Sequence, residues 1–178
     1  MLISSEYCEA PVFPFSIRPV TVSDADTLQQ VCWPERSLEA VQEMLQRSET
    51  MARRGNGLGI VALNDTGILG YGQLTLWPRI TEISDLIVRP EVRGQGIGTA
   101  LIGYLVDRVR LWRLPRVEIG AAVSNPRALA LYRRLGFHDA RTVTLDLGNG
   151  PEPVIYLIKI LEKDASPRHE RVDRSDEV

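Results

Sequence analysis

The stretch Arg93-Gly94-Gln95-Gly96-Ile97-Gly98 decides the fold of this chain. It follows the mainly apolar run 83–88 and precedes a segment, from Thr99 onward, in which apolar residues recur at helical spacing. The order is therefore strand, glycine turn, helix. Glycines at alternate positions leave backbone N–H groups uncovered by side chains, beside the positive end of the helix dipole. The stretch therefore predicts a site for a phosphate or a pyrophosphate.

Other roles of a glycine-rich turn compete with this one. A P-loop needs a lysine before its Ser or Thr, and no lysine precedes Thr99. A dinucleotide fingerprint needs a third glycine where Thr99 stands, and its turn follows the strand directly, whereas residues 90–93 intervene here. In its favour, Glu118 follows the turn at about the sequence distance of the acidic residue that binds a ribose. Glycines that only let the helix pack closely on the strand are the remaining alternative.

Composition sets the class of protein. The chain has 178 residues, is 44% hydrophobic and 25% charged, and carries a net charge of −2, which indicates a soluble globular protein without bulk nucleic-acid binding. Cys8 and Cys32 lack metal-ligand spacing, so we expect reduced thiols and no metal. No signal-peptide pattern and no apolar run of ~20 residues occurs, so we expect a cytoplasmic protein without a membrane partner.

The order of elements predicts the architecture. We expect strands at 13–20, 58–63, 68–77, 81–88, 117–123, 141–147 and 154–161, and helices beginning near 23, 37, 99 and 126. A loop is expected at 53–57, and Gly70 and Gly72 mark a bulge or a close backbone approach. An antiparallel meander followed by strand, helix, strand, helix and hairpin indicates a mixed α/β sheet. We expect one domain over 1–161 and a charged, disordered tail over 162–178.

Two blocks resemble a known family. Residues 86–101, with the core Arg93-x-x-Gly96-x-Gly98, resemble motif A of the GNAT superfamily of acyl-CoA-dependent N-acyltransferases. A second block, from Asn125 to Phe137, matches that family's pattern Asn-x-x-Ala-x-x-x-Tyr-x-x-x-Gly-Phe. The resemblance implies an α/β fold with a mixed, mostly antiparallel central sheet, flanking helices and a splayed parallel pair in the middle. It also implies acetyl-CoA as the co-substrate.

The same resemblance implies which residues hold the co-substrate. The diphosphate would lie on the turn, met by Arg93, Gly94, Gln95, Gly96, Ile97 and Gly98 and by the Thr99 hydroxyl. The pantetheine arm would pair, like an added strand, with the backbone of Leu86, Ile87 and Val88, where this strand splays from 117–123. Asn125 would reach the coenzyme or hold the splayed strand. It is equally a candidate N-cap for the helix that begins at Pro126, and both roles can hold.

Acyl transfer to an amine needs a base, a partner for the oxyanion and an acid for the leaving thiolate. Tyr132 matches the family's general acid, although core packing is an alternative role. A backbone N–H of Leu86 or Ile87 would meet the oxyanion. Glu82 is the first candidate for the base and Asp85 the second. Strand alternation places their side chains on opposite faces unless a bulge intervenes, and a solvated strand charge is the alternative for each.

The acceptor is the least defined part. We expect a small amine or a peptide, in a pocket built by the first two helices, the loop 53–57 and the last hairpin, with Trp33 and Trp77 as walls or loop anchors. Family members that act on protein N-termini often carry a glutamate where this chain has Gly120, which counts against a peptide N-terminus unless Glu118 substitutes.

Two other functions stay open. One is a coenzyme A-binding regulatory module that has lost catalysis, against which the presence of both Tyr132 and Glu82 argues. The other is a dinucleotide-binding domain with Glu118 on a ribose. The last hairpin mediates dimers in similar proteins, so a homodimer is a further expectation.

Overall fold

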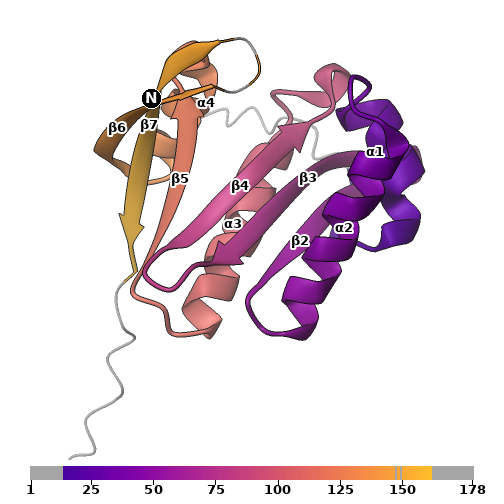
Figure 1. Cartoon of the computed structure of the whole chain (residues 1–178), viewed down its shortest axis with the longest axis horizontal. Helices are drawn as coiled ribbons and strands as arrows, with labels where there is room; N and C mark the ends of the chain where they lie inside the picture. The colour runs from indigo at the N-terminus through magenta and orange to yellow at the C-terminus, as the bar shows by residue number, and fades with distance from the viewer. Residues whose placement is uncertain (1–13, 147, 149, 162–178) are drawn as a thin grey trace, which may run out of the picture.

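The computed structural model describes residues 14–146, 148 and 150–161 (Figure 1). Its strands are β1 (Ser16–Pro19), β2 (Gly57–Asn64), β3 (Gly67–Leu76), β4 (Thr81–Val88), β5 (Arg116–Ala122), β6 (His138–Asp146) and β7 (Pro151–Ile160). Its helices are α1 (Ala25–Cys32), α2 (Leu38–Arg53), α3 (Ile97–Leu111) and α4 (Pro126–Arg134), with 3₁₀ turns η1 (Val22–Asp24) and η2 (Pro90–Val92). Within the described residues, no helix combines the length and the apolar character that a membrane crossing requires.

The described strands form one seven-stranded sheet in the order β1-β2-β3-β4-β5-β7-β6. Neighbouring strands are antiparallel, except that β4 and β5 run parallel. This confirms the mixed, mostly antiparallel sheet that the sequence predicted. The parallel pair has just two registered positions, Glu82 with Glu118 and Ile83 with Ile119, so the two strands diverge toward their C-terminal ends. The expected splayed pair is therefore present.

Helices cover the two faces of the sheet unequally. Helices α1 and α2 pack on β2 and β3 through one apolar cluster, which includes Leu28, Leu45 and Tyr71. Helices α3 and α4 pack on the opposite face through a second cluster, which includes Leu101 and Leu129. Figure 1 shows α2 in front of the sheet and α3 behind it. On the front face, no described helix covers β5, β7 and β6, so this half of the sheet is open.

The helix ends follow the chemistry of their caps. Ser37 caps α2, because its Oγ accepts a hydrogen bond from the Ala40 N–H at 3.2 Å. Pro126 stands in the first turn of α4, and Gly136 follows this helix with φ of +81°, the left-handed conformation that favours glycine. These three ends agree with the sequence prediction.

Several boundaries differ from the prediction. Helix α3 begins at Ile97 rather than Thr99, because the turn itself supplies the first helical residues. The loop predicted at 53–57 is shorter, since α2 continues through Arg53 and β2 begins at Gly57. Strand β6 begins at His138 rather than 141, before its expected start, and β7 begins at Pro151 rather than 154, inside the connecting turn. Strand β1 begins at Ser16, whereas Phe13, Cys8 and the tail 162–178 lie outside the described residues.

Strand β4 contains a bulge opposite Gly72. The register passes from Tyr71 with Ile87 to Gln73 with Ser84, so two residues of β4, Asp85 and Leu86, face one residue of β3. Asp85 has φ of +50°. Gly70 marks a close approach, because a β-carbon added there would lie 2.6 Å from the Ile87 carbonyl oxygen. Gly72 therefore marks the bulge and Gly70 the close backbone approach, the two alternatives that the sequence predicted.

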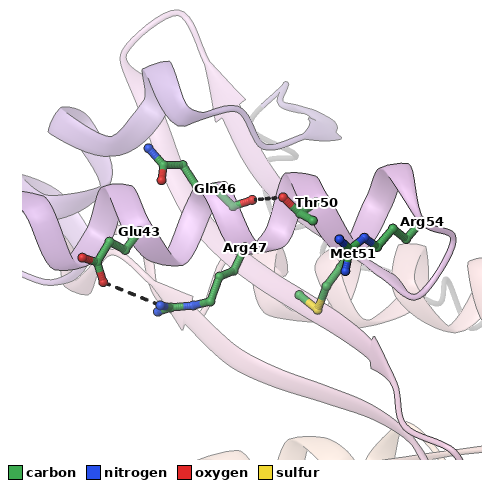
Figure 2. Close-up of a pocket in the computed structure, with 6 residues that line it drawn as sticks. All are labelled: Glu43, Gln46, Arg47, Thr50, Met51 and Arg54. Carbon is green, nitrogen blue, oxygen red and sulfur yellow. Dashed lines mark hydrogen bonds and ion pairs between the residues drawn. The ribbon is translucent and has the colours of Figure 1, made fainter.

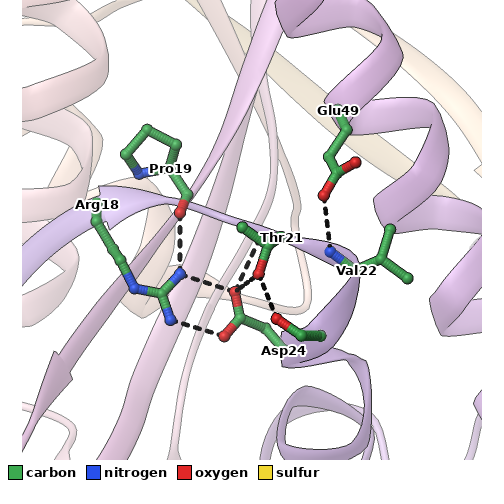
Figure 3. Close-up of polar contacts among 7 residues, drawn as sticks. Arg18, Pro19, Thr21, Val22, Asp24 and Glu49 are labelled. Carbon is green, nitrogen blue, oxygen red and sulfur yellow. Dashed lines mark hydrogen bonds and ion pairs between the residues drawn. The ribbon is translucent and has the colours of Figure 1, made fainter.

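A polar clamp ties β1 to the start of α1 (Figure 3). The Arg18 guanidinium donates to both Asp24 carboxylate oxygens, at 2.7 and 2.8 Å, and the Thr21 N–H donates to Asp24 Oδ2 at 2.9 Å. Glu49 of α2 accepts from the Val22 N–H at 2.9 Å. Burial alone would raise the pKa of Asp24, but the hydrogen bonds from Arg18 and Thr21 outweigh it, and this pKa lies below its ordinary value. The clamp fixes how α1 and α2 meet the sheet.

Candidate active site

The glycine turn has a backbone that favours glycine. Gly94 and Gly96 have φ of +81° and +82°, in the left-handed region, and a β-carbon added at either would have no atom within 4 Å. Conformation rather than space therefore selects glycine here. Arg93 Nε donates to the Val88 carbonyl oxygen at 3.0 Å, which ties the turn to the end of β4.

The turn presents a row of free backbone donors. The first backbone bond inside α3 runs from the Ala100 N–H to the Gly96 carbonyl oxygen at 2.9 Å, so the N–H groups of residues 97–99 have no partner in the helix. Among the described residues, no backbone acceptor meets the N–H groups of Gly94, Gln95 and Gly96 either. They lie at the positive end of a helix of 15 residues. The arrangement suits an anion with several oxygens.

The end of β4 borders this cradle. Leu86, Ile87 and Val88 lie beyond the last registered pair with β5, whereas Ile87 and Val88 pair with β3 on the other side. None of the described strands therefore pairs with the β5-facing edge of β4 over these residues. An extended ligand that carries amide groups can satisfy such an edge by pairing with it.

Helix α4 closes the same region from the back of the sheet. A β-carbon added at Gly98 would lie 3.6 Å from Leu131 Cδ2 and 3.7 Å from Val88 Cγ2, so the start of α3 lies beside both α4 and the end of β4. Tyr132, the next residue of α4, is buried and packs near Phe137, with 6.3 Å between the ring centroids. Burial raises the pKa of Tyr132 to about 12. Core packing of this residue is thus observed, and its role as an acid stays a prediction.

Asn125 has the structural role that the sequence offered as one of two. Its Oδ1 accepts from the Ala128 N–H at 3.2 Å and so caps α4, and its own N–H donates to the Ala122 carbonyl oxygen at 2.9 Å. The bonds hold the end of β5 beside the start of α4. The contact of Asn125 with a coenzyme stays a prediction.

Glu82 lies on the front face of the sheet. Tyr71 packs against α1 on this face, Thr75 shares the face because it is four residues further along β3, and Glu82 is paired with Thr75. Trp77 Nε1 donates to Glu82 Oε2 at 2.9 Å. The first base candidate, on β4, is therefore held by an indole next to the open half of the sheet.

Asp85 is placed by the bulge rather than by strand alternation. It is exposed, and its Oδ2 accepts from Ser84 Oγ at 3.3 Å. Because the bulge intervenes between the two base candidates, simple alternation does not assign them to opposite faces. Opposite faces were predicted for Glu82 and Asp85 unless a bulge intervened, and this bulge is present.

Trp33 is buried at the end of α1. It is 5% exposed, and its ring meets Tyr71 edge-on, with 5.2 Å between the centroids. It anchors the end of α1 in the core, which is the second of the two roles that the sequence offered for this residue. Trp77 is exposed and contacts Glu82.

The structure adds a cluster that the sequence reasoning missed. Arg141 Nη1 donates to Glu118 Oε2, and the Arg141 guanidinium lies 4.2 Å from the centre of the Tyr156 ring. Burial raises the pKa of Tyr156, and the nearby charge of Glu82 acts in the same direction. Glu118 is therefore engaged in an ion pair on the open half of the sheet, beside the first base candidate. Only the register of the last hairpin, which the sequence left undefined, brings Arg141 there.

A shallow hollow runs along α2, away from the glycine turn (Figure 2). It is lined by Glu43, Gln46, Arg47, Thr50 and Met51 of this helix and by Arg54, which follows its last residue. Arg47 reaches toward Glu43 at 3.7 Å, and both side chains are largely exposed. Neither this ion pair nor the hollow touches the predicted coenzyme residues.

Comparison with known proteins gives consistent matches. Residues 22–137 match the Acetyltransferase (GNAT) family. The chain is 38% identical over 64 residues, 36% of its length, to an uncharacterised N-acetyltransferase of Methanocaldococcus jannaschii. It is 33% identical over 95 residues, 50% of its length, to an L-methionine sulfoximine/L-methionine sulfone acetyltransferase of Pseudomonas aeruginosa. The match spans 28% of the first relative and 55% of the second.

Solved structures share the fold. A ribosomal-protein alpha-N-acetyltransferase in complex with coenzyme A superposes with a TM-score of 0.74 at 19% identity, over 86% of this chain and 98% of the other. A phosphinothricin acetyltransferase of Sinorhizobium meliloti in complex with acetyl-CoA gives 0.69 at 22% identity, over 90% and 96%.

Proposed function

Because the chain belongs to the GNAT acetyltransferase family, we propose that it transfers an acetyl group from acetyl-CoA to a primary amine. The transfer is a direct attack of the amine within a ternary complex. The observation that carries the proposal is the pairing of two features at one end of the sheet: the row of free N–H groups in the glycine turn, and the unpartnered edge of β4 beside it. One feature fits a diphosphate and the other fits an extended chain of amides.

The glycine turn and the end of β4 bind different parts of acetyl-CoA. The N–H groups of residues 94–99 bind the diphosphate oxygens, with Arg93, Gln95 and Thr99 exposed at the rim of the turn. The backbone of Leu86, Ile87 and Val88 binds the pantetheine arm, and Asn125 lies at the mouth of the splay. Relatives with the same fold have been solved with coenzyme A or acetyl-CoA, which supports this choice of co-substrate.

The chemistry uses three further groups. Acetyl-CoA supplies the thioester. Glu82 takes a proton from the acceptor amine, directly or through water, so that a neutral nitrogen attacks the carbonyl carbon. The N–H of Leu86 or Ile87 donates to the oxyanion that forms. As the C–S bond breaks, Tyr132 donates its phenolic proton to the departing sulfur.

Binding and turnover test the proposal separately. Calorimetric titration with acetyl-CoA and with NAD should give binding of acetyl-CoA alone, and binding of NAD alone would overturn the proposal. Turnover with a panel of primary amines, followed by release of free thiol, should then distinguish an enzyme from a binding module. Acetyl-CoA that binds without thiol release for any amine would support the regulatory module instead.

A further inference from the structure

The open half of the sheet carries a preformed charged cluster beside Glu82. Glu118 is in register with Glu82 on the neighbouring strand, and adjacent strands lie about 4.8 Å apart. Tyr156 is in register with both Gly120 and Arg141. A β-carbon added at Gly120 would lie 3.2 Å from the Tyr156 ring, so the missing side chain leaves room for the ring to lie across β5.

Arg141 is fixed on two sides. Its Nη1 donates to Glu118, whose side chain is 8% exposed, and its guanidinium stacks on the Tyr156 ring. A guanidinium has five N–H donors in a planar fork. Among the described residues, no partner meets Arg141 at Nε or Nη2, and its side chain is 41% exposed. The free donors are therefore pre-oriented on the open face.

The arrangement offers more than neutralisation of a buried carboxylate. A lysine would balance the charge of Glu118, whereas a stacked and hydrogen-bonded arginine presents a rigid fork that matches a carboxylate. Tyr156 lies close enough to Glu82, Glu118 and Arg141 to respond to all three charges. Glu82, which has no cationic partner among the described residues, and the partly free guanidinium of Arg141 thus both lie near Tyr156.

We infer that Arg141 determines acceptor specificity by binding a carboxylate next to the reacting amine, so that the acceptor is an amino acid. The inference rests on the proposed function and names the acceptor class for the same site. The amine lies toward Glu82, and its own carboxylate meets Nε and Nη2 of Arg141. A polyamine would bring a second positive charge to Arg141, and a peptide N-terminus lacks the adjacent carboxylate.

The experiment compares matched acceptors at saturating acetyl-CoA. Each of a set of L-amino acids is assayed by thiol release as the free acid, as the primary amide and as the amine without the carboxyl group. The values of kcat/KM are corrected for the fraction of neutral amine, because the three amines differ in basicity. For the wild-type protein we expect a preference of about tenfold or more for the free acid, the factor that a hydrogen bond to a charged group supplies.

Variants assign this preference to Arg141. Arg141→Lys keeps the charge opposite Glu118 but removes the fork, and should abolish the preference mainly through KM while turnover of the amides is retained. Arg141→Gln alone leaves the buried Glu118 carboxylate unpaired, which can prevent folding. The double variant Glu118→Gln/Arg141→Gln removes both charges and avoids this cost. Arg110→Gln, which breaks an exposed ion pair with Asp107 on α3, is the control and should keep the preference.

The outcomes separate the two proposals. Equal turnover of acids, amides and plain amines by the wild-type protein overturns the inference and leaves the acetyltransferase proposal standing. A preference for acids that survives in both Arg141 variants overturns the inference as well. Thiol release that no acceptor raises above the acceptor-free background overturns the proposed function and the inference together.

Discussion

Replacement of Tyr132 by phenylalanine separates its packing from its chemistry. Tyr132 is 5% exposed, and among the described residues its hydroxyl makes no hydrogen bond within the chain. Phenylalanine keeps the ring against Phe137 and removes an oxygen without a partner. We therefore expect the free energy of unfolding to change by less than about 1 kcal/mol.

The effect on catalysis should be large and independent of pH. Loss of a positioned general acid lowers kcat by a factor of roughly 10² to 10⁴. With a pKa of about 12, the phenol is protonated throughout the practical range. At pH 8 its ionised fraction is about 10⁻⁴, compared with about 10⁻² for an ordinary tyrosine. The deficit of Tyr132→Phe should therefore be the same factor at every pH from about 6 to 10.

The assay measures thiol release at saturating acetyl-CoA and acceptor across that range, with thermal unfolding of the same samples. Tyr104→Phe on α3 is the control, because the Tyr104 hydroxyl accepts a hydrogen bond from Arg108 at 2.7 Å, away from the glycine turn. A variant with undiminished kcat would refute the role of Tyr132 as the acid. A deficit that disappears as the pH approaches 10 would refute the high pKa on which the argument rests.

Three other predictions concern the turn, the base and the clamp. Gly96→Ala should weaken the binding of acetyl-CoA measured by calorimetry. It should also lower the free energy of unfolding by about 1 kcal/mol, a fall of roughly 2–4 °C in Tm, because φ of +82° disfavours a β-carbon even where space is free. Unchanged binding would count against the glycine turn as the diphosphate site. Glu82→Gln should lower kcat roughly 10²-fold or more at neutral pH. The deficit in kcat should shrink at high pH, where the acceptor amine is already neutral. A deficit that does not change with pH would argue for a structural role of Glu82. Asp24→Asn should lower the free energy of unfolding by about 2 kcal/mol, a value discounted because Arg18 is 40% exposed in the pair. Since the folded pKa of Asp24 is depressed, the stabilisation is present above the unfolded value near pH 4 and is lost as the pH falls through the folded value. The free energies of unfolding of wild type and variant should therefore approach each other as the pH falls below about 4. A difference that does not shrink with falling pH would contradict this.

Local chemistry made much of the fold predictable. The strand bounds of β4, the cap at Ser37 and the stop at Gly136 each depend on a few neighbouring residues, and each agrees with the structure. The glycine turn and the splayed pair followed from motif spacing and from the resemblance to a family. These features are encoded within short windows, where the residues that act together are also close in sequence.

The remaining features depend on register between distant segments. Arg141 meets Glu118 across 23 positions, and a register shift between Asp139 and Arg141 helps to set which side chains of β6 share a face. Asp85 lies in a bulge that exists only because of the pairing with β3. Trp33 reached the core because α1 docks on Tyr71. A single sequence does not specify such pairings, because a shift of one residue inverts every side chain on a strand.

An acetyl-CoA site built from main-chain atoms should tolerate many amino-acid substitutions. The groups that would hold the coenzyme are the N–H row of the turn and the open edge of β4, and every residue type except proline supplies the same N–H and C=O groups. In a saturation mutagenesis screen, most exposed side chains of the turn should therefore exchange freely, and intolerance should fall on Gly94 and Gly96, where the chain path itself is at stake, and on Ile97, which is buried in the core. Positions on the open front face should behave in the opposite way, since exchanges there change which amine is accepted and leave the grip on the donor intact. Acceptor choice and donor binding can thus diverge independently under selection within one sheet.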